Sequence, residues 1–407
     1  MSGVALKSGL RSLAVVAVIT SAALARAEIS DNTIRIGVLT DQSGLSADVS
    51  GKGSIAAAQM AIDQMGGSIN GKKIELIDAD SQNKPDIGAA IARRWYEQES
   101  IDVIVDVPVS SVALAVQTIA RERNKLVLFS TPASDAITGK ECSPTSAMWT
   151  YNGYALGKVV ATAVVKEGGD SWFFVTADYA GGIALENGAR SIVEASGAKV
   201  VGSVRHPFNT SDFSSYLLQA QASGAKVIAL ANAGNDMTNA IKQSQEFRIS
   251  SKNQNVVSLL LYLSDIHGLR LEAAQGLLVP TAFYWDRNEK SREWSKLFME
   301  RTGRMPTDVQ AGVGSAVGHY LQGIKATGSD DAATVLAWMK SHEINDFFTQ
   351  GGVLREDGQM VHDMYLAKVK RPSESKYPWD YLEIIQTVPG REAFRPLEQS
   401  QCQYVKK

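Results

Sequence analysis

The segment Ile34–Gln64, IRIGVLTDQSGLSADVSGKGSIAAAQMAIDQ, carries the pattern that decides the fold. Its first residues, Ile34–Leu39, form a compact apolar run typical of strands that are buried on both faces. A small polar loop follows, Asp41–Ser50, and then a predicted helix whose apolar residues are spaced by three and four. In such a strand–loop–helix unit the loop lies at the carboxyl end of a parallel strand, where ligands of doubly wound folds bind.

The same alternation continues through two successive halves of the chain. Apolar runs and amphipathic segments predict a β-α-β-α-β-α-β order up to Ser130. After a loop rich in Pro, Ser and Thr at Thr131–Ser146, strands and helices alternate again as far as a predicted strand at Val256–Leu263. The sequence therefore predicts an α/β fold with two lobes, each a mostly parallel sheet covered by helices.

The remaining segments predict several crossings between the lobes. A strand at Gly276–Ala282 is followed by three helices, a hairpin with Met360–Val369 as its second strand, and an irregular tail. We expect crossings near Trp149–Asn152, Pro280–Tyr284 and Asp346–Gly352. Several crossings make a hinge that bends but resists twisting, so a cleft should close over a ligand. The expected parts are a signal peptide at 1–27, lobe 1 at 28–150 plus 282–346, lobe 2 at 151–281 plus 347–371, and a C-terminal tail at 372–407.

The first 27 residues have the form of a secretory signal peptide. Lys7 and Arg11 give a basic start, Leu13–Leu24 is an apolar stretch too short to span a bilayer comfortably, and Ala25-Arg26-Ala27 has the form of a cleavage site. We expect cleavage after Ala27 and export to the periplasm, and a membrane anchor is the alternative interpretation. No later segment reads as a membrane helix, so we expect no direct membrane insertion after cleavage.

Charge and cysteine content narrow the partners further. The formal net charge of −2 gives no basic field that would predict nucleic acid or an acidic membrane surface as a partner.

The only cysteines are Cys142 and Cys402. Export permits a disulfide and an even count fits one. We favour a bridge, which would pin the tail to the loop after the fourth strand; two separate thiols are the alternative.

The sequence lacks the motifs of common catalytic classes. It has no G-x-S-x-G elbow, no phosphate loop ending in Gly-Lys-Ser/Thr and no H-E-x-x-H pattern, and its five histidines show no metal-ligand spacing. Gly51–Ala56 matches a loose dinucleotide pattern but lies about a dozen residues beyond the strand, outside the tight turn that this pattern needs. We therefore predict no enzyme, no metal and no cofactor. A secreted enzyme whose carboxylates meet only in space is the least favoured alternative.

Serine-bearing loops follow three predicted strands and have the character of an anion site. They are Asp41–Ser46, Val109-Ser110-Ser111 and Ser130–Asp135. Hydroxyls and free backbone N–H groups gathered at one sheet edge suit a carboxylate. Alternatively, Ser110 and Ser134 only cap helices or turns.

Aromatic residues gather near the expected crossings. Their faces could clamp a flat or apolar ligand body, and packing between the lobes is the alternative. They are Trp149, Tyr151 and Tyr154 at the first crossing, Phe283, Tyr284 and Trp285 at the second, and Tyr179 in a loop of the second half.

The ordered features resemble the type I periplasmic solute-binding proteins of ABC importers, in the branched-chain amino acid (Leu/Ile/Val) binding family. The residues that carry this resemblance are IRIGVLTDQSG, VPVSS, FSTPAS, DYAGG and AAQGLLVPTAFYWD, and they span the mature chain in order. The resemblance implies a Venus-flytrap fold that holds a small-molecule ligand between two lobes and delivers it to a membrane permease. It also implies a monomer.

The resemblance implies ligand-binding residues in both lobes. Together with Ser43 of the first loop, they are Val109, Ser110, Ala133, Ser134, Asp135, Tyr151, Tyr179, Asn232, Asp236, Phe283 and Tyr284.

One departure from the family pattern bears on the ligand. Amino-acid binders place a carboxylate near the end of the strand that matches Val256–Leu263, whereas Leu259–Leu261 stand there in this chain. Unless Asp236 or Asp265 substitutes, an ammonium group would be buried without a partner, which is costly. The sequence therefore predicts an aromatic carboxylate as the ligand. Similar members of the family, with the FYWD run and the late cysteine, look like binders of acids of the benzoate or hydroxycinnamate type. A branched-chain or other hydrophobic amino acid is second, and a short amide or urea is third; a sensor domain of the same fold is the alternative class.

Overall fold

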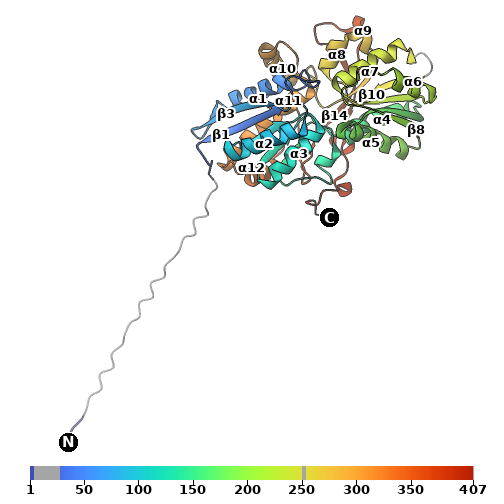
Figure 1. The fold of residues 1–407 in the computed structure, drawn as a ribbon. Helices are drawn as coiled ribbons and strands as arrows, with labels where there is room; N and C mark the ends of the chain where they lie inside the picture. The colour runs from blue at the N-terminus through green and yellow to red at the C-terminus, as the bar shows by residue number, and fades with distance from the viewer. Residues whose placement is uncertain (4–27, 250–253, 407) are drawn as a thin grey trace.

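The computed structural model describes residues 1–3, 28–249 and 254–406, of which 28–249 and 254–406 form two α/β lobes lying side by side (Figure 1). The apolar stretch and the cleavage site of the predicted signal peptide lie outside the described residues. Within the described ranges, no helix has the length and apolarity that crossing a bilayer would require.

The first lobe is built on a six-stranded sheet with the order β2-β3-β1-β4-β5-β6. All neighbours are parallel except β2 and β3, which are antiparallel. The strands are β1 (Thr33–Thr40), β2 (Ser68–Ile69), β3 (Lys72–Asp80), β4 (Val103–Asp106), β5 (Leu126–Phe129) and β6 (Ser146–Met148), and the first helices are α1 (Gly51–Gln64), α2 (Pro85–Gln98) and α3 (Ser110–Glu122).

Both faces of this sheet are covered, which explains its continuous apolar runs. On β4, Val103 and Val105 pack into the core that contains α1, whereas Ile104 packs into a separate core with α2 and α3. Because consecutive strand residues point to opposite faces, a strand with two covered faces needs apolar residues at every position. This is why the sequence predicted β1, β4 and β5 well.

The second lobe contains a four-stranded, fully parallel sheet with the order β10-β9-β7-β8. Its strands are β7 (Ser171–Ala177), β8 (Lys199–His206), β9 (Val227–Ala231) and β10 (Asn255–Ser258). Its helices are α4 (Gly153–Lys166), α5 (Ala180–Ala195), α6 (Ser214–Ala222), α7 (Gly234–Glu246), α8 (Leu263–Leu269) and α9 (Leu271–Ala274).

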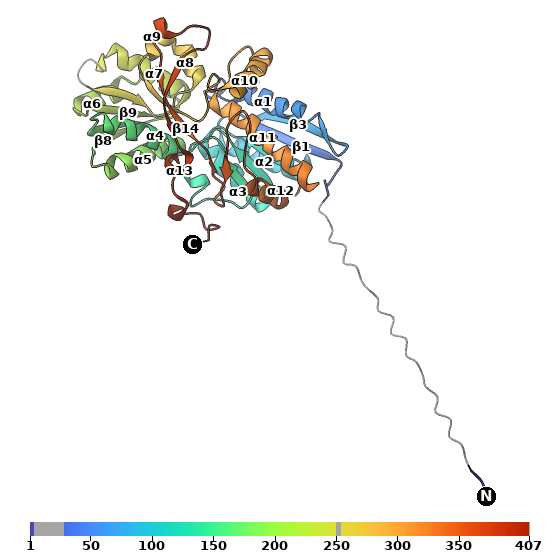
Figure 2. The ribbon, with the colours of Figure 1, turned by 180° about the vertical axis from the view of Figure 1, so that it is seen from behind.

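A third, antiparallel sheet lies between the lobes, where β14 is seen at the centre of both views (Figures 1 and 2). Its order is β11-β14-β15, and a small hairpin of β12 and β13 precedes β14. These elements are β11 (Leu278–Thr281), β12 (Val353–Leu354), β13 (Met360–Val361), β14 (Met364–Val369) and β15 (Leu382–Val388). Between β11 and β12 the chain returns to the first lobe as α10 (Glu289–Thr302), α11 (Asp308–Thr327) and α12 (Ala332–Ser341), of which α10 and α11 contact α1.

Four sequence predictions were wrong in detail. The predicted loop Thr131–Ser146 ends in a strand, β6, whose three residues are too short to show a pattern. The predicted strand Val256–Leu263 ends at Ser258, and Tyr262 caps helix α8, which the sequence prediction missed. An apolar run alone does not separate a buried strand from a buried coil, and Leu259–Leu261 are buried coil.

The other two differences concern the end of the chain. The predicted strand Met360–Val369 is broken at His362 and Asp363, so β13 and β14 belong to different sheets. The tail is not wholly irregular, because β15 pairs with β14. β15 lies at the edge of its sheet, and its middle residues are largely exposed, so it lacks the apolar run of a buried strand.

Cys142 and Cys402 form a disulfide, with their Cα atoms 5.5 Å apart, as the favoured interpretation of the sequence predicted. Both cysteines are buried. The bridge joins the tail to the loop that follows β5, so the end of the chain is covalently held on the first lobe.

Helices α4 and α5 pack unusually closely through glycines. A methyl group at Gly157 would lie 2.3 Å from the backbone nitrogen of Ala189, and one at Gly188 would lie 2.2 Å from the carbonyl oxygen of Gly153. The lack of a side chain therefore sets the distance between these two helices where α4 crosses the middle of α5.

We predict that Gly157→Ala destabilises the protein by about 1–3 kcal/mol, because the helices cannot approach without displacing backbone. Gly318→Ala is the matched control, since a methyl at Gly318, also within a helix, meets no atom within 4 Å. That control should be neutral or stabilising by up to about 1 kcal/mol. Chemical unfolding followed by circular dichroism measures both, and equal stability of the two variants would refute the packing argument.

Candidate functional site

Three helices from the two lobes begin at one cavity. Its lining includes the N-cap residues Val109 of α3, Tyr179 of α5 and Ala233 of α7. None of these residues makes a side-chain capping hydrogen bond. The first N–H groups of a helix have no partner within the helix, and the helix dipole makes this end positive. Three such ends around one space favour a negatively charged group there.

The cavity wall carries no charged side chain. It is lined by the polar residues Ser46, Ser110, Thr131, Tyr179 and Tyr262 and by Leu45, Val49, Pro108, Val109, Ala133, Phe208, Ala233, Gly234 and Leu260. Among the described residues, no group of three or more His, Cys, Asp or Glu side chains is placed to hold a metal ion. The wall therefore offers hydroxyls, backbone N–H groups and apolar surface.

Ser110 is positioned by contacts within the first lobe. It is the first residue of α3, and its Oγ accepts a hydrogen bond from the backbone N–H of Ala133 at 3.2 Å. Its own hydroxyl proton remains available for a ligand. Ser110 and Ala133 are both almost fully buried, so this donor is held away from bulk water.

The loop before Ser110 is strained and tied down. Val107 has φ of +55°, which is unfavourable for a β-branched residue and is typically found at sites with a functional constraint. Next to it, the buried carboxylate of Asp106 accepts hydrogen bonds from Thr40 at 2.7 Å and from Thr131. This network fixes the carboxyl ends of β1, β4 and β5 together, which holds the three loops in one place.

Aromatic side chains line the cavity from the second lobe. Tyr179 packs against Phe208 with ring centroids 4.8 Å apart. Tyr262 reaches the first lobe through Tyr151, because the two hydroxyl oxygens are 2.6 Å apart and Tyr151 donates to the carbonyl of Thr131 at 3.1 Å. Since Tyr151 has one proton, Tyr262 is the donor in the bond between them.

Four of the residues predicted for the site line this cavity: Val109, Ser110, Ala133 and Tyr179. Tyr151 lies behind Tyr262, to which it is hydrogen-bonded. Phe283 and Tyr284 line a smaller neighbouring cavity of about 10 Å³ that shares Tyr262 with the first.

The other predicted residues lie elsewhere. Ser43 donates to Asp80 at 2.6 Å on the surface, and Ser134 and Asp135 line a separate cavity. Asn232 contacts His206, and Asp236 accepts from the N–H of Asn209, so only their neighbours Ala233 and Gly234 reach the site.

Sequence reasoning missed several wall residues. Ser46 and Thr131 belong to loops that the sequence singled out, so their chemistry was anticipated but not their positions. Tyr262 was hidden in a run interpreted as a strand. Phe208 follows β8, whose exposed pattern gave no signal.

No acidic side chain faces the cavity where an ammonium group would need one. Asp236 and Asp265 were the candidates, and neither lines it. The carboxylate of Asp265 instead accepts from the N–H of Tyr262 at 3.1 Å, where it caps α8. Asp308 lines the smaller cavity and is held by Thr281 at 3.2 Å.

The cavity is about 20 Å³, which is room for about one water molecule. A ligand as large as a benzene ring therefore requires the walls to separate. Because these walls belong to different lobes, such a separation is a movement of the lobes.

Comparisons with known proteins agree with this architecture. A family model described as periplasmic binding protein matches residues 33–376. Leu/Ile/Val-binding protein homolog 6 of Brucella melitensis biotype 1 is 24% identical over 392 residues, which cover 94% of this chain and 96% of that protein.

Solved structures are also similar. A periplasmic binding protein from Burkholderia mallei has a TM-score of 0.90 and 43% identity, covering 93% of this chain and 100% of that one. A branched chain amino acid ABC transporter periplasmic ligand-binding protein from Burkholderia xenovorans has a TM-score of 0.83 and 39% identity, covering 91% and 100%. A solute-binding protein of an ABC transporter from R. palustris in complex with benzoate has a TM-score of 0.80 at 20% identity, covering 91% and 99%, which shows the fold alone.

The capping bond from the N–H of Tyr262 to Asp265, at the start of α8, can be tested through its effect on the pH dependence of stability. Burial raises the pKa of the Asp265 carboxyl from 3.8 to about 7, so the folded state holds this proton more tightly than the unfolded state. The stability from Asp265 is then complete below about pH 4 and is lost as pH rises through about 7. Asn keeps the accepting oxygen but does not titrate. We predict that Asp265→Asn gains stability relative to the wild type as pH rises from about 4 to about 7 and keeps this gain at higher pH, measured as melting temperature.

Asp212→Asn is the control for this experiment. Hydrogen bonds from Ser214 lower the pKa of the Asp212 carboxyl, so its contribution changes only at more acidic pH. A pH-independent difference between Asp265→Asn and the wild type would contradict the prediction.

Proposed function

We propose, on the premise that this chain belongs to the periplasmic binding protein family and is the substrate-binding protein of an ABC transporter, that its ligand is a small aromatic carboxylate. The protein would capture this ligand in the periplasm as a monomer, close its lobes over it and deliver it to a membrane permease. The family and fold are those of transport proteins, which are not enzymes.

The observation that carries the proposal is the meeting of three uncapped helix starts. Val109, Tyr179 and Ala233 come from both lobes, so an anion between them interacts favourably with each lobe. Backbone N–H groups and the Ser110 hydroxyl supply the hydrogen bonds that a buried carboxylate needs. The absence of acidic residues from the wall avoids repulsion of this charge.

The rest of the wall supports an aromatic body on that carboxylate. Tyr179, Phe208 and Tyr262 offer ring faces and edges, and Leu260 and Val49 add apolar surface. Planar rings pack favourably against such side chains. A zwitterion fits less well, because its ammonium group would meet no carboxylate.

Ligand-driven closure follows from the composition of the wall. The first lobe supplies Ser110 and the second supplies Tyr179 and Tyr262. A ligand that contacts both lobes binds an arrangement closed around it better than a fully open one, and it shifts the population by this difference in affinity.

A branched-chain amino acid is the second candidate. The description of the Burkholderia xenovorans protein, at 39% identity, favours it. The benzoate complex, at 20% identity, adds no argument about this ligand.

We predict that benzoates and hydroxycinnamates raise the melting temperature of the protein more than leucine or valine does, since a ligand of the native state stabilises it by mass action. A thermal-shift panel measures this, and mass analysis after prolonged incubation should recover the ligand unchanged. Stabilisation by leucine that depends on Ser110, without any by aromatic acids, would establish the second candidate instead. A chemically altered ligand would indicate an enzyme.

We also predict that Ser110→Ala weakens binding of the aromatic acid by about 1–3 kcal/mol, because a hydrogen bond to a charged group is lost. Ser134→Ala is the matched control: Ser134 is also buried and lies in the neighbouring loop, but it does not line this cavity. Isothermal titration calorimetry should show unchanged affinity for the control. Equal losses in both variants would contradict the assigned position of the carboxylate.

A further inference from the structure

A second, larger cavity of about 550 Å³ lies between the lobes and the C-terminal tail. Its walls include Leu114 of α3, Ile183 of α5, the loop that contains Asp135, and Arg395 and Pro396 of the tail. The volume is in the usual range for small-molecule sites. None of these residues lines the first cavity, so the two spaces have separate walls.

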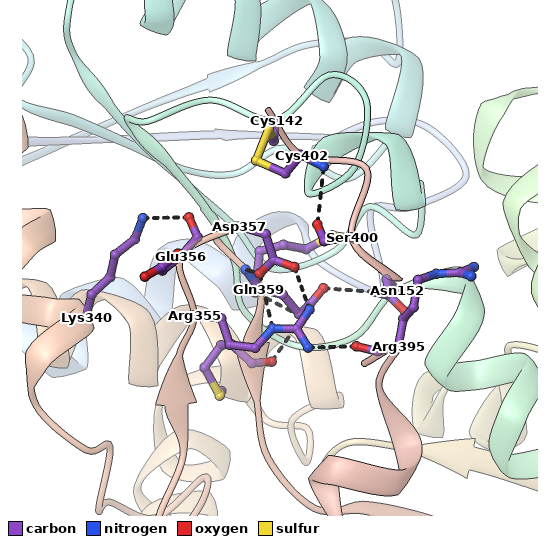
Figure 3. Close-up of polar contacts among 12 residues, drawn as sticks. Cys142, Asn152, Lys340, Arg355, Glu356, Asp357, Gln359, Arg395, Ser400 and Cys402 are labelled. Atoms are coloured by element: carbon purple, nitrogen blue, oxygen red, sulfur yellow. Dashed lines mark hydrogen bonds and ion pairs between the residues drawn. A yellow bond between two sulfur atoms is a disulfide. The ribbon is translucent and has the colours of Figure 1, made fainter. Parts of the chain in front are cut away.

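Arg395 has an unusually open guanidinium group. Among the described residues its side chain has no hydrogen-bond or ion-pair partner, and it lies over the ring of Tyr154 at 4.3 Å from the centroid. The backbone carbonyl of Arg395 accepts from Arg355 at 2.7 Å, as Figure 3 shows. The backbone of Arg395 is thus held and its guanidinium rests on the ring of Tyr154, while the N–H donors of the guanidinium remain available.

Asp135 supplies the opposite charge beside it. One carboxylate oxygen accepts from the backbone N–H of Tyr154 at 3.1 Å, and no other hydrogen bond to this carboxylate is formed by the described residues. Burial raises the pKa of Asp135 to about 6, while that hydrogen bond and the charge of Arg395 lower it. Asp135 and Arg395 line the same cavity and both contact Tyr154, yet they form no ion pair with each other. Tyr154 holds both, one by its ring and one by its backbone.

The other charged side chains that line this cavity are either paired with one another or exposed to solvent. Arg355 pairs with Asp357 at 2.5 Å (Figure 3), and Lys140 and Glu141 are exposed on the surface. Arg395 and Asp135 are therefore the two charged groups that remain to bind a ligand. A guanidinium binds a carboxylate in a fork of two hydrogen bonds, and a carboxylate binds an ammonium group.

We propose that this second cavity binds a zwitterionic α-amino acid with an apolar side chain, whose carboxylate contacts Arg395 and whose ammonium group contacts Asp135. The apolar side chain packs against Leu114, Ile183 and Pro396. This site differs from the first cavity in its charges, since the first has neither a cationic nor an acidic side chain in its wall. The inference therefore does not depend on the proposed function.

The tail completes this site, and the disulfide holds the tail in place. Arg395 lies seven positions before Cys402, which is bonded to Cys142 on the first lobe. Ser400, which also lines the cavity, accepts the N–H of Cys402 at 3.2 Å (Figure 3). Because Tyr154 belongs to α4 of the second lobe, the segment from Arg395 to Cys402 crosses from one lobe to the other beside the ligand.

Isothermal titration calorimetry with L-leucine tests the proposal on the full mature chain. We expect binding to the wild type and at least a tenfold loss of affinity in Arg395→Gln and in Asp135→Asn. L-Leucinamide, which lacks the carboxylate, should bind at least tenfold more weakly than L-leucine, and this comparison requires no variant to fold. Lys140→Gln is the control, because it removes an exposed cation from the same cavity and should leave the affinity unchanged.

Three outcomes would overturn the inference. They are no binding of L-leucine by the wild type, an equal loss of affinity in Lys140→Gln and Arg395→Gln, and binding that Arg395→Gln retains but Ser110→Ala abolishes. Benzoate separates this test from that of the proposed function. Its binding should be unchanged in Arg395→Gln and weakened in Ser110→Ala, so a failure of benzoate to bind refutes the proposed function without affecting the second site.

Discussion

The direction of the strands in the two lobes is the constraint on which the site depends. In each parallel sheet the following helix starts at the carboxyl end of a strand, so its free N–H groups gather at one edge. In this protein the edges of both lobes face one cavity, and α3, α5 and α7 begin there without side-chain caps. The partial positive charges of these helix starts therefore meet between the lobes without any lysine or arginine in the cavity wall. A ligand held in this way is bound by backbone N–H groups, and the fold alone determines where these groups lie.

Such backbone binding requires rigid loops, and buried polar contacts supply the rigidity. Asp106 joins Thr40 and Thr131 across three strand ends, and Val107 is kept at positive φ beside it. The hydroxyl groups of Tyr151 and Tyr262 then link the first lobe to the second. The hydrogen bonds of Asp106 lie within one lobe and are unaffected by a hinge movement, whereas movement of the lobes would strain the bond between Tyr151 and Tyr262. The strength of the tyrosine bond thus affects how readily the cavity opens.

The sequence predicted most of the fold because strands with two covered faces need continuous apolar runs, and helices such as α2, α3 and α7 have clear periodicity. It failed where burial did not follow a pattern, as at Leu259–Leu261, which are buried coil, and at β15, which is a largely exposed edge. For the site, it found the loops but not every residue. Ser110 and Ser134 both follow a predicted strand in the sequence, and only the path of their loops in space shows that Ser110 alone lines the first cavity. Phe208 comes from the second lobe, from a segment whose sequence has no pattern that predicts a site.

The two cavities show why the arrangement of charges, and not only their number, decides what a binding protein accepts. The first cavity is surrounded by three positive helix starts and has no charged side chain in its wall, which suits an apolar ligand with a single negative charge. The proposed second site has Arg395 over the ring of Tyr154 and Asp135 at its backbone N–H, which suits a molecule with both charges. An amino acid in the first cavity would leave its ammonium group unpaired, and an aromatic acid in the second would leave Asp135 facing a like charge. On these two proposals, the same chain separates two kinds of carboxylate by the charges that each cavity offers, with one cavity at the starts of α3 and α5 and the other along these helices.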